Sequence, residues 1–459
     1  EMMRVAFYTL GCKVNQYETD IMKKEFKDKG YDIVDFDKKA DIYVVNSCSV
    51  TNMSTRKTRQ YLSRAKKQGG IVVLVGCYAE EIKEDIKKNT CIYDKNGNEI
   101  VSISYGDTAF FDNVKSYYLA LVLDDVINDI KEKENVSEDE AENILVTRGY
   151  KIYTCEDINI QNKLEEVYNN YDKFLNNAES ATVILDNNTG TIVAIVGGRN
   201  KDNRVITFGE PNYNDNVVTN KNRATERLSQ PGGMLSILSV YACGLEKGVI
   251  TLNSKYIDEP IKIGNYIPSN YYNGFKGEMT IEEAIKSGTN VIKVKVMQDI
   301  GIGTSYEFLK DLGINSVNEK YDKNLHALSL GGLTMGCTLL ELSSAYRTVL
   351  TDGEYKEPVS YSRVVDSKGN IYLEKKGETR KVLKEDVCNS LKYCLKKNID
   401  GKQVYIKSAS SVNHNCDWST IITDKYTLST WYGCDNIGNI KSNDLEAKKL
   451  TLNLLDKIY

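Results

Sequence analysis

Three short apolar runs near the beginning of the chain most constrain what it can fold into. They cover residues 3–10, 41–46 and 71–75, are rich in Val, Ile, Tyr and Phe, and are too short for typical helices. Helical patterns over residues 16–29 and 54–67 lie between them. The resulting order, β-α-β-β-α-β, predicts a small parallel sheet with flanking helices.

Each of these runs ends at a cysteine. Cys12, Cys48 and Cys77 follow the first, second and third run, and a glycine precedes both Cys12 and Cys77. The carboxyl ends of parallel strands share one edge of a sheet, so thiols that are far apart in the sequence would converge there. Three thiolates can hold an iron–sulfur cluster and leave one iron open. Three buried structural cysteines are the alternative interpretation.

The residues around these cysteines carry a specific resemblance. They read Thr-Leu-Gly-Cys-Lys-Val-Asn-Gln-Tyr-Glu over 9–18, Val-Asn-Ser-Cys-Ser-Val-Thr-Asn over 45–52 and Gly-Cys-Tyr-Ala over 76–79. This pattern resembles the N-terminal domain of the radical-SAM tRNA methylthiotransferases, in the branch that acts on threonylcarbamoyl-adenosine. The resemblance implies that Cys12, Cys48 and Cys77 bind an auxiliary [4Fe–4S] cluster, with Asn15 and Asn46 supporting the loops.

The rest of that family's machinery is missing from the sequence. The radical-SAM core requires Cys-x3-Cys-x2-Cys, and this spacing does not occur, so the S-adenosylmethionine site is absent. A methylthiotransferase role would therefore need a separate radical-SAM partner. A basic cluster on the second predicted helix could contact tRNA phosphates, or could simply be a solvated face. Its members are Arg56, Lys57, Arg59, Arg64, Lys66 and Lys67.

A connecting module is expected over residues 88–177. It contains predicted strands at 100–105 and 149–154 and predicted helices at 113–133 and 157–174. Ser137 and Glu140 have the spacing of a capping box that opens one more helix. The stretch from residue 136 to 166 resembles the linker that precedes the transpeptidase domain of class A penicillin-binding proteins.

The third expected domain covers residues 178–459. Two apolar strands flank an Asn-Asn-Thr-Gly turn, which predicts a hairpin; an apolar helix follows Pro231-Gly232, and Thr280 and Glu283 form a second capping-box pattern. In order and spacing this part resembles the transpeptidase domain of class A penicillin-binding proteins. Its markers are Asn222-Arg223-Ala224-Thr225, Gln230-Pro231-Gly232, Leu330-Gly331-Gly332 and Trp431-Tyr432-Gly433. The implied fold is α+β: a five-stranded antiparallel sheet sandwiched by helices, beside a helical lobe.

The three catalytic motifs of that family are degenerate here. In the family, Ser-x-x-Lys supplies the nucleophile and its base, Ser-x-Asn relays protons, and Lys-Thr/Ser-Gly binds the substrate carboxylate. The corresponding positions of this chain are Gly233, Ser236, Gly288, Asn290, Lys407, Ser408 and Ala409. The nucleophile, the base and the serine of the second motif are all replaced, and the third motif ends in alanine.

These losses predict a scaffold without acyl transfer. Asn290, Lys407 and Ser408 could still bind a peptidoglycan stem peptide or a β-lactam non-covalently. Ser236 is a candidate replacement nucleophile, but no lysine stands beside it. Two alternatives remain open: a methylthiotransferase fragment that works with a radical-SAM partner on tRNA, and a fusion or chimera with no joint function.

Composition limits the location and the partners. No apolar run approaches the ~20 residues that span a bilayer, and the first residues lack a signal-peptide pattern, which predicts a cytoplasmic chain. The resemblance of the third domain implies an extracytoplasmic origin instead. The net charge of −4 gives no global indication of nucleic acid or membrane binding, and 11 cysteines without paired spacing favour reduced thiols.

Overall fold

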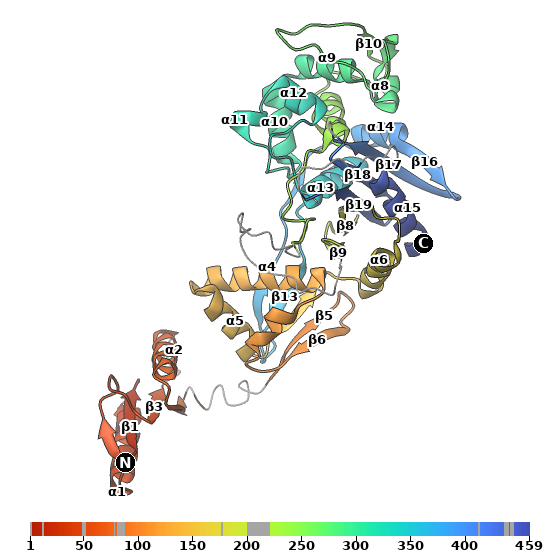
Figure 1. Ribbon diagram of the computed structural model, residues 1–459. Helices are drawn as coiled ribbons and strands as arrows, with labels where there is room; N and C mark the ends of the chain where they lie inside the picture. The colour runs from red at the N-terminus through yellow and green to blue at the C-terminus, as the bar shows by residue number, and fades with distance from the viewer. Residues whose placement is uncertain are drawn as a thin grey trace.

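The structure is a computed structural model of the chain, shown in Figure 1. The residues that it describes are 2–11, 13–47, 52–77, 79, 88–175, 178–199, 221–411, 414–435, 440 and 445–459.

The N-terminal part is a four-stranded parallel sheet with strand order β2-β1-β3-β4. Its elements are β1 (Arg4–Thr9), α1 (Lys13–Asp28), β2 (Asp32–Val34), β3 (Ile42–Ser47), α2 (Asn52–Lys67) and β4 (Ile71–Gly76). The predicted parallel sheet and its element order are therefore confirmed. Each of the three long strands begins and ends within one or two residues of the apolar run that predicted it.

Alternation along β1 explains why this sheet needs a helix on each face. Val5 and Phe7 point to one side, where they pack with Phe26 of α1. Ala6 points to the other side and belongs to a cluster with Tyr43 and with residues of α2. Successive side chains of a strand face opposite ways, so a strand with apolar residues at every position must be covered on both faces.

A second sheet joins segments that are far apart in the sequence. Its order is β14-β13-β7-β5-β6. The strands are β5 (Thr90–Tyr93), β6 (Glu99–Ile103), β7 (Lys151–Thr154), β13 (Tyr361–Val365) and β14 (Ile371–Glu374). The expected connecting module thus draws two strands from beyond residue 178. The predicted domain boundaries at residues 87 and 177 stay predictions.

Helices of the connecting module follow the predicted pattern. They are η2 (Thr108–Asn113), α4 (Tyr117–Glu134), α5 (Glu138–Thr147) and α6 (Ile158–Asn170). The capping box at the start of α5 is formed, because the Ser137 hydroxyl accepts from the Glu140 N–H and the Glu140 carboxylate accepts from the Ser137 N–H. In Figure 1 this module runs from orange to the dark yellow of α6, and the pale blue β13 lies among its orange elements.

The largest sheet is antiparallel and has the order β16-β17-β18-β19-β8-β9. Its strands are β8 (Glu179–Asp186), β9 (Ile192–Val196), β16 (Lys396–Ile399), β17 (Lys402–Ser410), β18 (Cys416–Ile422) and β19 (Tyr426–Gly433). The β8–β9 hairpin was predicted. The expected strand count of five is wrong by one, because the short β16 pairs with β17 and extends the edge.

Helices cover both faces of this sheet. On one face Tyr168 of α6 is hydrogen-bonded through its hydroxyl to Thr182 of β8 at 2.8 Å. On the other face Ser429 of β19 donates to Ser343 of α13 (Leu339–Leu350) at 2.9 Å. Helix α15 (Glu446–Ile458) also packs on β18 and β19. The sandwich implied by the sequence is therefore confirmed.

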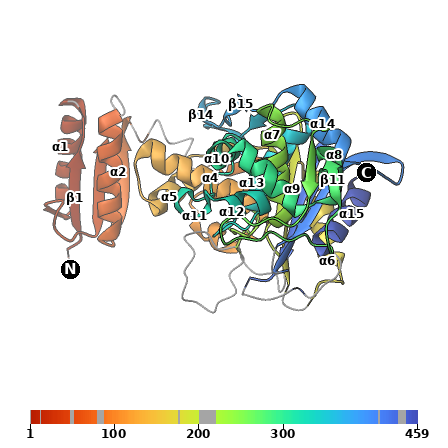
Figure 2. The ribbon, with the colours of Figure 1, turned by 90° about the horizontal axis from the view of Figure 1, so that it is seen from above.

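A helical lobe lies beside the sheet, in green in Figures 1 and 2. It contains η5 (Ile237–Ala242), α7 (Cys243–Glu246), α8 (Ile281–Ser287), α9 (Asn290–Ile300), α10 (Ile302–Asp311), α11 (Glu319–Asp322) and α12 (Leu325–Leu330), with the hairpin β10 (Lys255–Asp258) and β11 (Gly277–Thr280). The predicted capping box of Thr280 and Glu283 opens α8. The apolar helix expected after Pro231-Gly232 begins as a 3-10 turn, η4 (Gly232–Met234), and continues as the π-helix η5.

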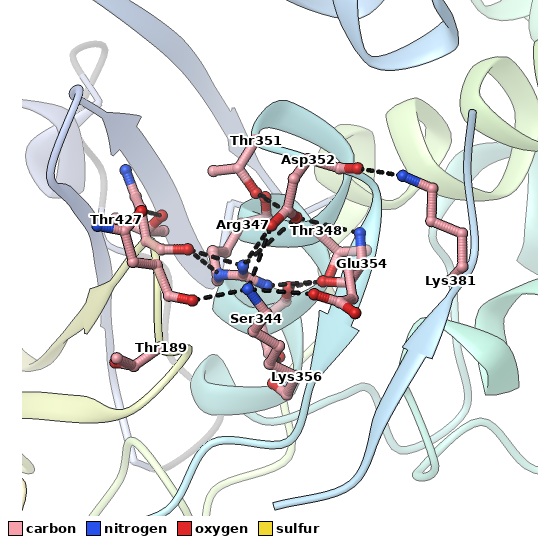
Figure 3. A network of polar contacts seen from close by, with 12 residues as sticks. Thr189, Ser344, Arg347, Thr348, Thr351, Asp352, Glu354, Lys356, Lys381 and Thr427 are labelled. Carbon is pink, nitrogen blue, oxygen red and sulfur yellow. Dashed lines mark hydrogen bonds and ion pairs between the residues drawn. The ribbon is translucent and has the colours of Figure 1, made fainter. Parts of the chain in front are cut away.

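A fully buried arginine ties the sheet to its covering helix, as Figure 3 shows. Arg347 of α13 donates from Nη2 to the Asn187 carbonyl oxygen at 2.7 Å and from Nη1 to that of Glu354 at 2.8 Å, beside Asp352. Burial lowers the pKa of this guanidinium. Asn187 belongs to the hairpin turn, so Arg347 supplies charged donors to backbone carbonyl oxygens on two segments that flank the helix.

Three further elements complete the description: β12 (Glu354–Lys356), β15 (Thr379–Lys381) and α14 (Glu385–Leu395). The nine cysteines in the described part of the chain are all free thiols. Within the same residues, every helix is too short or too polar to cross a membrane.

Candidate functional site

The three strands that precede the predicted cluster ligands in the sequence end at one edge of the N-terminal sheet. The Leu10 N–H, just beyond β1, donates to the Asn46 carbonyl oxygen at 2.7 Å, and Ser47 of β3 pairs with Gly76 of β4. Positions 12, 48 and 77 therefore all come shortly after adjacent strand ends. Cys77 is exposed, whereas Cys12 and Cys48 lie outside the described residues.

This edge is held by two buried asparagines. The Asn15 amide donates to the Asn46 side-chain oxygen at 3.2 Å and to the Ser47 carbonyl oxygen at 2.9 Å, and the Asn46 amide donates to the Asn15 carbonyl oxygen at 2.9 Å. Gly76 has a φ of +89°, and a Cβ there would lie 2.3 Å from the Asn46 side-chain oxygen. Only glycine fits so tightly beside this pair.

The described residues alone contain no group of three His, Cys, Asp or Glu side chains that could hold a metal ion. That search did not reach Cys12 or Cys48, so the cluster stays a prediction. The strand-end topology fits it, because three parallel strands deliver the three positions to one edge.

Of the basic residues on α2, five are exposed: Arg56, Lys57, Arg64, Lys66 and Lys67.

The second candidate site lies where three segments meet around Gly232. The Gly232 N–H donates to the Gly331 carbonyl oxygen at 3.2 Å. A Cβ on Gly232 would lie 2.4 Å from the Ser410 carbonyl oxygen, and one on Gly331 would lie 2.0 Å from the Gly232 carbonyl oxygen. Both glycines also have positive φ. The start of η4, the end of β17 and the turn after α12 can approach this closely only because side chains are absent there.

Gly233 differs from these two glycines. A Cβ at this position would meet one atom within 4 Å, the Ala409 Cβ at 3.4 Å, which is ordinary van der Waals contact. Its φ is not positive. The backbone therefore has room for a side chain at the position where the family places its nucleophile, so crowding does not explain the glycine.

Ser236 does not point into open space. It is fully buried, and its hydroxyl donates to the Gly233 carbonyl oxygen at 2.9 Å, one turn back along the same helix. A serine hydroxyl bonded to its own helix in this way satisfies a local acceptor and has no base to activate it.

The second motif forms the turn between α8 and α9. Gly288 ends α8 with a φ of 66°, and Thr289 precedes the first residue of α9. Asn290 opens α9, and its amide donates to the Ser269 carbonyl oxygen at 3.0 Å. The side-chain oxygen of Asn290 accepts from the Lys293 amine, also at 3.0 Å.

The third motif lies on β17, where side chains alternate between the faces of the sheet. Lys407 and Ala409 share the face that meets Gly233, because Ala409 supplies the neighbour of that glycine. Ser408 points to the opposite face, and its hydroxyl is hydrogen-bonded to that of Ser419 at 2.9 Å. Burial lowers the pKa of Lys407.

Lys293 is a buried lysine beside the second motif that the sequence reasoning missed. The residue is only 5% exposed. Burial, and then the positive charge of Lys407, lower the pKa of its amine to about 7. The available signal was a lysine inside the apolar stretch Val-Ile-Lys-Val, one helical turn after Asn290. Lys293 is thus hydrogen-bonded to the second motif through Asn290, and its pKa is affected by Lys407 of the third motif.

Comparisons with known proteins agree with both resemblances. The model of uncharacterized protein family UPF0004 matches residues 4–95, and that of the penicillin binding protein transpeptidase domain matches residues 180–409, half of the chain. Threonylcarbamoyladenosine tRNA methylthiotransferase MtaB of Bacillus subtilis is 47% identical over 87 residues, which are 18% of this chain and 19% of that protein.

Penicillin-binding protein 1A of Clostridium tetani is 26% identical over 426 residues, covering 84% of this chain and 50% of the relative. The chain thus spans about half the length of that protein. Among solved structures, penicillin-binding protein A of M. tuberculosis as an imipenem acyl-enzyme complex has a TM-score of 0.60 at 14% identity, covering 82% of this chain and 99% of that one. This likeness shows the same fold. The chain therefore belongs to the penicillin binding protein transpeptidase domain family, with a UPF0004 domain joined to its N-terminal side.

Proposed function

We propose that the transpeptidase-like part of this chain binds cell-wall peptides or β-lactams without forming an acyl bond. One observation carries this proposal: position 233 has no hydroxyl, and the nearest serine along the helix, Ser236, is buried and bonded to a backbone carbonyl. Acyl transfer needs a nucleophile, and removing it from such a unit costs several orders of magnitude in rate. The scaffold around the missing group is otherwise preserved.

Three side chains remain for binding. The Lys407 amine would pair with the carboxylate of a stem peptide or a β-lactam, and the Asn290 amide would bind a peptide carbonyl. Ser408 is the third predicted contact. Since its hydroxyl is bonded to Ser419, a ligand would have to replace that bond to engage it. Ala409 adds a methyl group where the family has glycine, which narrows the space for substrate backbone.

A fluorescent penicillin tests this proposal directly. We expect no covalent label after denaturation, while a transpeptidase with an intact Ser-x-x-Lys motif is labelled stoichiometrically in parallel. Equilibrium dialysis with a D-alanyl-D-alanine peptide should detect reversible binding that weakens in Lys407→Met. A penicilloyl adduct found by mass spectrometry on any side chain of the cleft would contradict the proposal.

A second candidate function rests on the N-terminal sheet. Its three strand-end positions and its likeness to a tRNA methylthiotransferase support a [4Fe–4S] domain that works on tRNA with a separate radical-SAM partner. The exposed lysines of α2 would contact phosphates. Replacing Lys66 and Lys67 by Gln should then weaken tRNA binding in filter assays at low salt, and unchanged binding would count against this function.

The two parts could also have no joint function. In that case the fusion would be a rearranged gene product or a chimera. The junction supports this alternative because the radical-SAM core is missing after the first part. One full-length transcript and one full-length protein in the source cell would contradict it.

A further inference from the structure

A buried amine without an acidic partner lies beside the second motif. Lys293 forms no ion pair with any described residue, and the one side-chain contact that its amine makes is to the Asn290 oxygen at 3.0 Å. Burying an ammonium group without a counter-charge is costly, and the neighbours of Lys293 along α9, Val291, Ile292 and Val294, are buried as well. A lysine in such a place needs an explanation that packing alone does not provide.

The amine contacts the asparagine of the second motif, which the family pattern places opposite the lysine that this chain lacks. The family pattern puts a lysine at position 236, opposite the asparagine of the second motif, and this chain has Ser236 there. Lys293 reaches that asparagine from α9 instead of from η5, and it lies close enough to Lys407 of the third motif to be affected by its charge. The amine therefore contacts the remnant of the second motif, and α9, which carries it, packs against η5, the helix that follows Gly233 and Ser236.

We propose that Lys293 supplies the amine that this cleft lost at position 236, so that a hydroxyl at position 233 is the one group missing for acylation by a β-lactam. This inference rests on the proposed function, in which the chain as it stands forms no acyl bond. Gly233 can accept a side chain, because a Cβ there meets only the Ala409 methyl group, at 3.4 Å.

The restored step needs no further reactant. The hydroxyl oxygen introduced by G233S would attack the lactam carbonyl carbon, forming an ester bond while the lactam C–N bond breaks. The hydroxyl proton would pass to the neutral Lys293 amine and then to the released nitrogen. A neutral amine is available near neutral pH because burial and Lys407 hold the pKa of Lys293 at about 7. Helices η5, α7, α10 and α12 and strand β10 all pack against α9. Their titratable side chains are Tyr241, Cys243, Glu246, Lys255, Tyr256, Asp258, Tyr306, Glu307, Lys310, Asp311 and His326.

The test compares four variants for labelling by fluorescent penicillin: G233S, G233S/K293M, G233S/K295M and G233S/S236K. Lys295 is the matched control, since it lies on the same helix but pairs with Glu259 at 2.8 Å. We expect G233S and G233S/K295M to be labelled, with a rate that rises through about pH 7 as the amine loses its proton. G233S/K293M should be labelled at least ~100-fold more slowly. Thermal unfolding checks that each variant is folded.

Each other outcome overturns the inference. Equal labelling of G233S and G233S/K293M would show that Lys293 is not the base. Labelling of G233S/S236K but not of G233S would show that the amine must stand at position 236, and no labelling of any folded variant would show that more than a hydroxyl is missing. Labelling of the unchanged chain would instead refute the proposed function, so the two failures are distinguishable.

Discussion

The N-terminal sheet and the transpeptidase-like cleft keep opposite parts of their family patterns. The sheet retains all three cysteines at its strand ends, but the radical-SAM core that would use them is absent from the chain. The transpeptidase-like part has the fold of its family, but glycine occupies position 233, where we expect the nucleophilic serine of the family. The contrast teaches that fold and chemistry are carried by different residues. Buried apolar residues specify the fold, and a handful of polar side chains specify the reaction.

The largest expected effect is on iron binding by the N-terminal sheet. Anaerobic reconstitution should load ~4 Fe per chain and give a brown absorbance, if Cys12, Cys48 and Cys77 hold one cluster. Replacing any one of them by Ala should remove most of the iron, while Cys91→Ala, in the next sheet, should change nothing. Iron content that is unchanged in all three variants would show that these cysteines do not bind a cluster.

The next effect tests the scaffold that the cleft has kept. Arg347→Met removes a fully buried guanidinium and leaves the carbonyl oxygens of Asn187 and Glu354 without their donor. The free energy of unfolding should fall by roughly 3–5 kcal/mol. The exposed Lys376→Met serves as control and should change it by less than about 0.5 kcal/mol. Urea unfolding measures the free energy of unfolding of both variants. A small effect of Arg347→Met would mean that the hydrogen bonds of Arg347 contribute little to stability.

A pH-dependent effect concerns the buried amine beside the second motif. The pKa of Lys293 is about 7 in the folded chain and 10.5 for an ordinary lysine, so between these values the unfolded state binds more protons. Stability should therefore rise with pH above 7, by roughly 2–3 kcal/mol between pH 7 and pH 9 at 1.36 kcal/mol per pH unit. The free energy of unfolding of Lys293→Met should not show this rise. The variant should therefore exceed the unchanged chain in stability most strongly below pH 7. If the free energy of unfolding depended on pH in the same way for Lys293→Met and the unchanged chain, the Lys293 amine would be solvated.

The smallest effect tests whether the two regions are independent. Asn46→Ala removes a buried amide that joins β3 to α1, which should cost the N-terminal sheet about 1–3 kcal/mol. Calorimetry should show a lower melting temperature for that part alone, with the transition of the transpeptidase-like part unmoved. A shift in both transitions would mean that the two regions unfold together and are not independent.

Local pattern was enough to place most elements. The apolar runs that became β1, β3 and β4, the β8–β9 hairpin and both predicted capping boxes depend on residues close in sequence, so their signal is visible in a short window. The pairing of β13 with β7 joins residues about 200 positions apart and leaves no such signal. The edge strand β16 was missed because it is four mostly polar residues long.

The sequence by itself determined which chemistry is possible: three cysteines at strand ends, and a cleft with glycine where a hydroxyl should stand. Only the tertiary structure decided how the remaining groups are used. It left room beside Gly233, buried Ser236 and Lys293, and brought Lys293 under the influence of the Lys407 charge. The physical reason is that residue identity fixes what a side chain can donate or accept, whereas its environment, set by contacts between distant segments, fixes its partners and its charge.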